Sequence, residues 1–264
     1  MSAESAVFVD DLATLRELDG EYDRVYFGNE FCDKRMPDPE AVTGVYEYCE
    51  DRGLATTLVT PIMTPTKESE MAALFEHVGS TGMDVELVFN DLGAYDLAEE
   101  VGAFDRMAAG RVLSGQKRGP AVDALSGDGG VELQEGGEPV TDQVNEHFEK
   151  SVVNVPYARD HFDEMGVDRV ELDVLSHGMY DETIDFSASV YYPWTYVSVK
   201  RWCRESTSVP LCDENCPDVV QTLDNRPATP ELLYRKNNVI FTYTDDVPDL
   251  NYVDREVFMP DPVN

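Results

Sequence analysis

Basic residues are scarce in this sequence of 264 residues. Only 20 Lys and Arg stand against 53 Asp and Glu, which gives a formal net charge of -33. A chain without basic patches cannot release phosphate counterions, which argues against general nucleic-acid binding. The acidic residues are spread along segments that also hold 13 Tyr and 11 Phe, unlike a disordered acidic tail. We therefore expect a halophilic, folded protein whose self-repulsion is screened within about 3 Å at ~1 M salt.

Long apolar runs are also absent. No stretch approaches the ~20 apolar residues that a membrane-spanning helix requires. The N-terminal sequence M-S-A-E-S-A-V-F-V-D-D has neither the basic region nor the apolar core of a signal peptide. We therefore expect a cytoplasmic protein that does not enter a membrane. Because disulfides are rare in that compartment, clustered cysteines favour metal binding over cystine formation.

Several catalytic signatures are missing. The sequence contains no H-E-x-x-H motif, and no G-x-G-x-x-G follows the first expected strand. No order of Ser, His and Asp residues suggests a hydrolytic triad. These absences weaken a peptidase and a dinucleotide-binding interpretation, and they leave the cysteines as the most informative residues.

Three of the five cysteines, Cys203, Cys212 and Cys216, lie close together, with eight and then three residues between them. Thiols clustered in this way hold a metal or form a disulfide. A four-coordinate site needs one more ligand, and Cys32 and Cys49 are the remaining thiols. Cys49 has helical spacing from two valines, which predicts a core position. Cys32 follows a strand in a polar loop and is the expected fourth ligand.

Short apolar segments alternate with amphipathic ones along most of the chain. Strands are expected at residues 22–27, 54–59, 85–89, 111–114, 152–155, 169–175 and 238–243, and a β-rich segment at 187–200. Helices are expected at 6–20, 38–51, 67–79, 94–101 and 158–166. This alternation predicts an α/β fold, a parallel β/α barrel of the TIM-barrel type, complete or partial, in a single domain over residues 1–264. A doubly wound open sheet is the alternative.

Two regions interrupt the alternation. Residues 119–141 are rich in Gly, Asp and Glu with little apolar periodicity, which predicts a flexible surface insertion. Residues 200–220 form a cysteine-bearing C-terminal region. The tail beyond residue 243 is rich in Asp and Pro and is expected to be irregular.

Chemistry in a β/α barrel occurs where strands run into the loops that follow them. Asn90, Asp91 and His177 lie at such ends, and Glu171 lies within a strand. His177 and Glu171 are the candidate catalytic residues, although a structural role is the more common one for a histidine in the position of His177. Asn90 and Asp91 are candidate substrate-binding residues, and Asp91 could instead cap the next helix.

The two basic residues after Cys32 are further candidates. Lys34 and Arg35 could lower the pKa of the Cys32 thiol and bind an anionic substrate, or they could be solvated charges. The aromatic residues between 191 and 196 could form a wall for a flat ring, or part of the core. The three other histidines, His77, His147 and His161, lie on expected helices and are interpreted as surface residues.

The segments V-Y-F-G-N-E-F-C-D-K-R, F-N-D-L-G and V-E-L-D-V-L-S-H-G resemble the collagenase-like peptidase family. The resemblance covers roughly residues 20–220, including the cysteine pair spaced C-x-x-x-C, and is greatest to members that act in ubiquinone biosynthesis. It departs from the family after Gly178, where a cysteine is expected and Met179 and Tyr180 stand instead. The segment 180–196 is longer, and the spacing between Cys203 and Cys212 is shorter.

The resemblance implies a [4Fe-4S] cluster held by Cys32, Cys203, Cys212 and Cys216, and a paralogous partner subunit in a heterodimer. It implies a component of an oxygen-independent hydroxylation system that acts on a small molecule, either a quinone precursor or another aromatic or nucleobase substrate. From the residues alone, four thiolates could equally hold zinc. A non-catalytic partner subunit with a structural metal is therefore the alternative function, and a peptidase activity would depend on the family label only.

Overall fold

The computed structural model describes residues 3–119, 134–135, 138–139, 141–182, 185–200, 212, 216–217, 219–224 and 232–263. Eight parallel strands close into a barrel, and they follow one another around it in chain order. They are β1 (Glu4–Val9), β2 (Arg24–Gly28), β3 (Ala55–Val59), β4 (Val85–Phe89), β5 (Met107–Ala109), β8 (Arg169–Asp173), β9 (Ser187–Tyr192) and β14 (Val253–Phe258). β1 pairs with both β2 and β14, which closes the ring. The predicted barrel is confirmed and is complete, and the doubly wound alternative is wrong.

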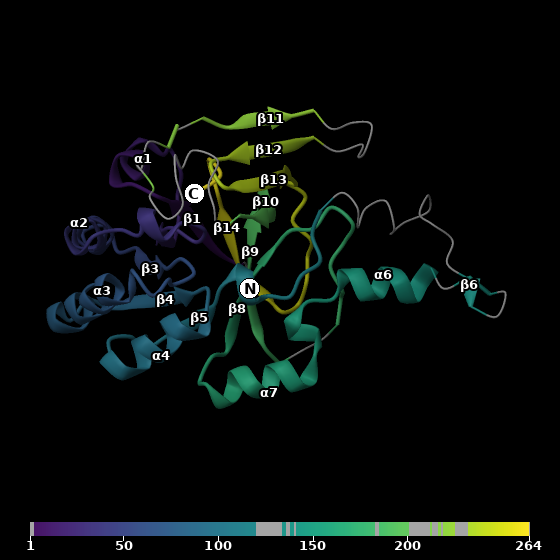
Figure 1. Ribbon diagram of the computed structural model, residues 1–264, viewed down its shortest axis with the longest axis horizontal. Helices are drawn as coiled ribbons and strands as arrows, with labels where there is room; N and C mark the ends of the chain where they lie inside the picture. Colours follow the sequence, from purple (N-terminus) through teal and green to yellow (C-terminus); the bar gives the residue numbers. More distant parts are fainter. Residues whose placement is uncertain are drawn as a thin grey trace.

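Helices cover one side of the barrel (Figure 1). α1 (Leu12–Glu17), α2 (Pro39–Glu50), α3 (Glu68–Thr81) and α4 (Leu92–Val101) each follow one of the first four strands. Asp11, Asp38 and Asp91 begin three of these helices, because each carboxylate accepts a hydrogen bond from a backbone N–H in the first turn. Gly82 and Gly102 end α3 and α4 in the left-handed conformation. None of the described helices is long and apolar enough to cross a membrane.

The connection between β5 and β8 is longer and less regular. It contains the 3-10 helix η2 (Arg111–Leu113), the short strands β6 (Gln134–Glu135) and β7 (Glu138–Pro139), α6 (Thr141–Glu149), the 3-10 helix η3 (Val152–Asn154) and α7 (Pro156–Glu164). Another 3-10 helix, η1 (Asp33–Arg35), follows β2. η2 and η3 lie side by side, because the backbone N–H of Val152 donates to the carbonyl of Ser114.

A four-stranded antiparallel sheet stands between β9 and β14, where a regular β/α unit would have a helix. Its strands, in spatial order, are β10 (Trp194–Val199), β13 (Val239–Tyr243), β12 (Leu233–Lys236) and β11 (Gln221–Leu223). This cap sheet lies at the top of Figure 1. Tyr196 and Phe241 from the cap sheet form one apolar cluster with Phe31, which follows β2. The cap sheet therefore covers the mouth of the barrel, where the strands end.

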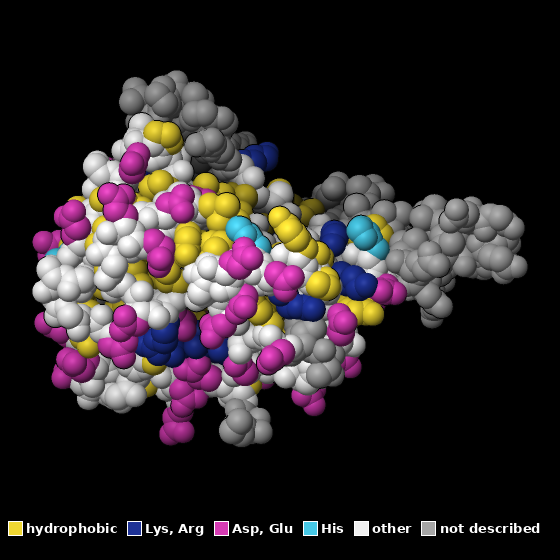
Figure 2. All heavy atoms as spheres, turned by 90° about the horizontal axis from the view of Figure 1, so that it is seen from below, with side chains coloured by type: hydrophobic (Ala, Val, Ile, Leu, Met, Phe, Trp, Pro, Cys, Tyr) yellow, Lys and Arg dark blue, Asp and Glu magenta, His cyan; other side chains and the backbone are white. Residues whose placement is uncertain are grey.

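Successive side chains along each strand point to opposite faces, so the core has two parts, one outside the barrel and one inside it. Outward-facing residues such as Val25, Leu87 and Leu172 pack beneath the helices. Inward-facing residues, among them Tyr26 and Tyr191, fill the barrel. Asp and Glu side chains are scattered over the face shown in Figure 2, where Lys and Arg side chains are fewer. A salt-rich habitat, which the charge of -33 suggested, stays a prediction.

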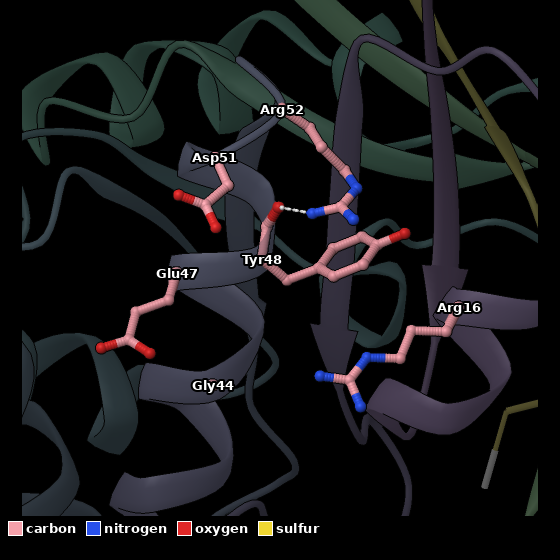
Figure 3. A pocket seen from close by; sticks show the side chains of 6 residues that line it. All are labelled: Arg16, Gly44, Glu47, Tyr48, Asp51 and Arg52. Atoms are coloured by element: carbon pink, nitrogen blue, oxygen red, sulfur yellow. Dashed lines mark hydrogen bonds between the residues drawn. The ribbon is translucent and has the colours of Figure 1, made fainter.

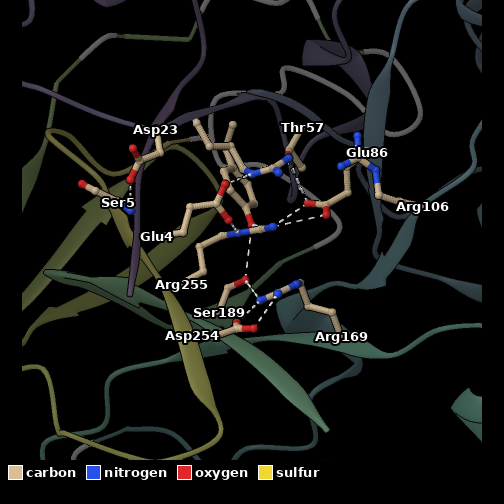
Figure 4. A network of polar contacts seen from close by, with 12 residues as sticks. Glu4, Ser5, Asp23, Thr57, Glu86, Arg106, Arg169, Ser189, Asp254 and Arg255 are labelled. Carbon is tan, nitrogen blue, oxygen red and sulfur yellow. Dashed lines mark hydrogen bonds and ion pairs between the residues drawn. The ribbon is translucent and has the colours of Figure 1, made fainter. Parts of the chain in front are cut away.

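Charged side chains fill the end of the barrel where the strands begin (Figure 4). Arg255 donates to Glu4 at 2.5 Å and to Glu86 at 2.6 Å. Arg24 donates to the other oxygen of Glu4 at 2.8 Å and to Thr57 at 3.0 Å. Because each guanidinium contacts a carboxylate, the charges are compensated inside the barrel. This end therefore forms a polar plug rather than an opening.

The sequence-based prediction is wrong in four places. Residues 6–20 are not one helix, since β1 ends at Val9 before α1 begins. The expected strands at 111–114 and 152–155 are the 3-10 helices η2 and η3, and β5 is the strand that precedes η2. The tail contains β14, which closes the barrel. Parallel strands covered on both faces show little polar alternation, so β1 resembled an apolar helix in sequence.

Other sequence predictions concern regions that the structure describes only in part. The expected insertion at 119–141 and the region at 200–220 lie largely outside the described residues. Cys49 is fully buried in α2, as predicted. His77, His147 and His161 lie on α3, α6 and α7, as predicted, although His77 is half-buried and contacts Thr43.

Gly28 at the end of β2 should tolerate no side chain. Its φ is +137°, and a Cβ there would lie 2.1 Å from the carbonyl oxygen of Val59. Gly53 has a φ of +68° with nothing within 4 Å of an added Cβ, so Gly53→Ala should cost only about 1–2 kcal/mol. We expect Gly28→Ala to lower the free energy of unfolding by clearly more than this matched control. Urea denaturation of both variants checks this, and equal losses would contradict it.

Candidate functional site

The turn after β2 carries Cys32 across the mouth of the barrel. The side-chain oxygen of Asn29 accepts hydrogen bonds from the backbone N–H groups of Phe31 at 3.1 Å and Cys32 at 2.8 Å. From the cap sheet, the amide of Asn238 donates to the carbonyl of Phe31 at 2.9 Å. The turn is thus fixed both by its own side chain and by the cap sheet.

The Cys32 thiol is half-buried and lies at the start of η1. Burial raises its pKa, and the backbone amides of Lys34 and Arg35 act in the opposite direction. Cys216 raises the pKa of the Cys32 thiol further, by charge repulsion. Such repulsion falls off over roughly 10 Å at moderate ionic strength. Two cysteines far apart in the sequence therefore lie near each other at the barrel mouth.

The structure brings together two of the four predicted metal ligands. Cys32, Cys212 and Cys216 form no disulfide and are half-buried, while Cys203 lies outside the described residues. Within the described part of the chain, no three His, Cys, Asp or Glu side chains gather into a group that could hold a metal ion. Cys32 and Cys216 account for half of the predicted thiolate site. Cys212 is described but does not gather with them into a group of three, and Cys203 lies outside the described residues.

A buried ion pair lies directly behind this turn. Glu30 and Arg111 are both fully buried, although they are far apart in the sequence. Nε of Arg111 donates to the two carboxylate oxygens of Glu30 at 3.2 and 3.0 Å, and Nη2 makes a further short contact. Burial lowers the pKa of Arg111, but Glu30 and Asp173 raise it by more, so its net shift is upward. The guanidinium therefore stays charged.

A second carboxylate extends the ion pair across the mouth. Asp173, the last residue of β8, accepts from Nη1 of Arg111 at 2.7 Å and from Nε of Arg118 at 2.7 Å. Gln116 donates to the carbonyl of Asp173 at 2.9 Å and accepts from its N–H at 2.8 Å. Glu30, Arg111, Asp173 and Arg118 thus form a mouth network that joins the ends of β2, β5 and β8.

Aromatic rings surround the guanidinium at the centre of the mouth network. The Cζ atom of Arg111 lies 4.2 Å from the ring centroid of Tyr191, 5.4 Å from that of Phe31 and 5.6 Å from that of Tyr196. Tyr191 is fully buried, so the core interpretation holds for this member of the aromatic segment. Desolvated cation–π contacts of this kind strengthen the hold on a buried guanidinium.

Glu171, a candidate catalytic residue, lies in the barrel interior and is fully buried. Its carboxylate accepts a hydrogen bond from Ser189 at 3.1 Å and a longer one from Tyr26 at 3.3 Å. Burial raises the pKa of Glu171 to about 7, although Arg255 and Arg169 act in the opposite direction. Glu171 thus belongs to the polar end of the barrel, where the strands begin.

His177 lies in the loop after β8 and is half-buried. Its Nε2 is 3.3 Å from the carbonyl oxygen of Phe148 in α6. The two candidate catalytic residues therefore occupy different environments, one on a loop and one inside the barrel. Their role in catalysis stays a prediction.

The candidate substrate-binding residues Asn90 and Asp91 hold backbone groups at the mouth. The amide of Asn90 donates to the carbonyl of Thr60 at 2.8 Å and accepts from the N–H of Val112 at 3.2 Å. Asp91 caps α4 and also accepts from the N–H of Met63. The capping interpretation of Asp91 is confirmed, and contact of either residue with a substrate stays a prediction.

Lys34 and Arg35 both lie in η1 beside Cys32. One guanidinium nitrogen of Arg35 lies 3.6 Å from a carboxylate oxygen of Asp10, which follows β1. Burial raises the pKa of Asp10, while Lys236 and Arg35 oppose it. Basic groups thus accompany the thiol, and their contact with a substrate stays a prediction.

The mouth network is what the sequence analysis missed. Arg111 was placed in a strand with Val112 and Leu113, and Glu30 was noted only as part of a polar loop. A single arginine next to apolar residues in an acidic chain was the available signal, because such a charge must find carboxylates when it is buried. Which carboxylates it meets depends on the barrel.

A separate surface pocket of about 390 Å³ lies between α1 and α2 (Figure 3). Its lining comprises Arg16, Gly44, Glu47, Tyr48, Asp51 and Arg52. The guanidinium of Arg52 lies 3.6 Å above the ring of Tyr48. Because α2 ends next to the start of β3, the pocket lies at the opposite end of the barrel from Cys32. It contains none of the predicted site residues, so the mouth stays the candidate site.

Comparison with known proteins gives a distant structural likeness. No protein-family profile and no curated protein matches the sequence. The solved structure of the U32 peptidase Mk0906 is similar, with 12% sequence identity and a TM-score of 0.41, over 99% of this chain and 93% of that chain. This likeness is too weak to carry an argument about activity, so the site must be argued from its own residues.

The buried carboxyl of Glu171 should make stability depend on pH. Its pKa rises from an ordinary value of 4.5 to about 7 on folding. The contribution is therefore complete below pH 4.5 and is lost as the pH rises through 7. Glu171→Gln mimics the protonated carboxyl. Relative to the unmodified chain, it should gain on the order of 3 kcal/mol in unfolding free energy between pH 4.5 and 7.

Asp254 provides a control of opposite sign for this measurement. Burial raises the pKa of Asp254, but Arg169, Ser187 and Arg255 together lower it by more, so the net shift is downward. Asp254→Asn should therefore lose stability relative to the unmodified chain as the pH rises through the acid range. Denaturation at a series of pH values measures both differences. A difference for Glu171→Gln that does not change with pH would contradict the assignment.

Proposed function

We propose that this chain binds a [4Fe-4S] cluster through Cys32, Cys203, Cys212 and Cys216. In this proposal it is a component of an oxygen-independent hydroxylation system, similar to the ubiquinone-biosynthesis protein UbiV. The proposal is carried by the electrostatic coupling of Cys32 and Cys216, in which charge on Cys216 raises the pKa of the Cys32 thiol. Thiols that far apart in sequence have no local reason to meet, and a shared ligand supplies one.

The surroundings of Cys32 support the proposal. The backbone amides of Lys34 and Arg35 lower the pKa of the Cys32 thiol against the effect of burial, and they suit a thiolate whose charge is shared with a metal. Bound there, a cluster would supply electron transfer, with a potential set by net charge, hydrogen bonds and exposure. Zinc is the alternative ion for the same four thiolates, because it also accepts four cysteines.

The substrate in this proposal is a small aromatic molecule, such as a quinone precursor or a nucleobase. Lys34 and Arg35 lie next to Cys32 and are the basic groups nearest to it in the sequence. His177 is partly accessible, whereas Glu171 is fully buried. Of the two candidate proton-transfer groups, His177 is therefore better placed to contact a substrate that arrives from solvent.

A second function, a non-catalytic partner subunit, is favoured by a specific feature. The mouth network and the cap sheet occupy the end of the barrel where enzymes of this fold hold their substrates. In this second function the metal only stabilises the fold of the cap region, and a paralogous UbiU-like partner in a heterodimer carries out the chemistry. A peptidase ranks third, because among the described residues no hydrogen bond joins a nucleophile to a base at the mouth.

Anaerobic purification at high salt tests the cluster. The unmodified chain should be brown and contain about four irons per chain, and Cys32→Ala should lose the colour and the iron. Cys49→Ala is the matched control, since Cys49 is buried in α2 and should leave the iron content unchanged. Visible absorption and iron, sulfide and zinc counts give the result. A colourless chain with one zinc would overturn the redox function.

Substitution of His177 separates the two functions. In an enzyme, His177→Ala should lower hydroxylated product by roughly 100-fold or more, as expected for loss of a general acid or base, while the iron content stays the same. His161→Ala on α7 is the control, because His161 is exposed. If His177→Ala keeps full activity in the presence of the partner chain, the partner-subunit function is favoured.

A further inference from the structure

We propose that Arg111 is a positioning residue for the Cys32 thiol. It holds Glu30, and through Glu30 the turn that carries Cys32. The inference rests on the proposed thiolate site and goes beyond it. It assigns a role in metal binding to a buried ion pair whose members are not among the proposed ligands.

The connection from Arg111 to Cys32 is short and rigid. Glu30 is separated from Cys32 by Phe31 alone, and the side chain of Asn29 binds the backbone N–H groups of both Phe31 and Cys32. Gly28 begins this turn with a φ of +137°, packed against the carbonyl of Val59. The backbone therefore has little freedom to absorb a displacement of Glu30, and a shift there moves Cys32.

Arg111 is the only group that holds the Glu30 carboxylate among the hydrogen bonds of the described residues. The Arg111 guanidinium is in turn fixed by Asp173 at 2.7 Å and stacked against the ring of Tyr191. Arg118 binds the same Asp173 and the backbone carbonyl of Arg111. Glu30 is thus anchored to the ends of β5 and β8, across the mouth from its own strand.

The planar guanidinium of Arg111 allows one side chain to hold two carboxylates in a fixed geometry. Arg111 directs Nε and Nη2 at Glu30 and Nη1 at Asp173, which is a fork that one ammonium group cannot reproduce. Arg111→Lys keeps the positive charge and loses this geometry. The substitution therefore separates positioning from simple charge compensation.

The polar end of the barrel offers a matched control. Arg255 is also buried, contacts the two carboxylates of Glu4 and Glu86, and lies against the ring of Tyr26. It resembles Arg111 in burial and partners, but it lies where the strands begin. Arg255→Lys should disturb folding stability in a comparable way without moving Cys32.

The test uses the full-length, reduced, metal-free chain titrated with Co²⁺ alone, with the thiolate–cobalt absorption band as the signal. Loss of a residue that orients a ligand typically lowers metal affinity by ~10–100-fold. We expect a loss in that range for Arg111→Lys and for Glu30→Gln, and an affinity near that of the unmodified chain for Arg255→Lys. Equal affinities for Arg111→Lys and Arg255→Lys would overturn the proposal.

A second readout does not depend on metal. Diamide oxidises two neighbouring thiols to a disulfide, and mass spectrometry can follow the Cys32–Cys216 product in the metal-free chain. Arg111→Lys should slow this reaction relative to Arg255→Lys, and an unchanged rate would count against positioning. If the unmodified chain binds no Co²⁺ but the rates still differ, the proposed cluster fails while the positioning role stands. Should Arg111→Lys not fold, Glu30→Gln provides both measurements.

Discussion

The pairing of Arg111 with Glu30 and Asp173 is the constraint on which the mouth of this barrel depends. A fully buried guanidinium must be compensated, and removal of one partner of such a pair typically costs about 3–5 kcal/mol. Here the partners come from the ends of three different strands. Arg111 can be buried only if β2, β5 and β8 stand in their places around a closed ring. The ion pairs therefore tie the turn of Cys32 to the whole barrel.

The same principle governs the opposite end. Arg24 and Arg255 lie among Glu4 and Glu86 inside the barrel, and an apolar layer with Phe8, Tyr26 and Tyr191 separates this group from the mouth network. The interior thus consists of two compensated charged layers with aromatic rings between them. Buried ion pairs are weak evidence of net stability, because desolvation offsets much of the attraction. Their value here lies in fixing which side chains face one another.

This arrangement bears on where chemistry can occur. With the barrel filled by its own side chains and its mouth covered by the cap sheet, the accessible chemical groups at that end are those outside the mouth network. Cys32, Lys34 and Arg35 are such groups, each partly accessible. The barrel then acts as a rigid support for the turn, as expected for functional residues carried by loops on a rigid scaffold.

Sequence periodicity located most of the barrel. The strand at 85–89 and the helices around 38–51 and 67–79 were found because strands and helices have different apolar spacing. β5 and β14 were missed for physical reasons. β5 has only three residues, too few for any periodicity, and β14 carries charged residues that are compensated by partners from β1 and β4.

The sequence by itself determined the class of fold, the unbalanced charge and the cysteines that could share a ligand, because composition and local spacing are written in the chain. Only the tertiary structure decided that Cys32 lies near Cys216, that Glu171 is buried in the barrel with a raised pKa, and that Arg111 joins Glu30 to Asp173. These contacts join residues distant in sequence. They exist only because eight parallel strands close into a ring and bring their ends together.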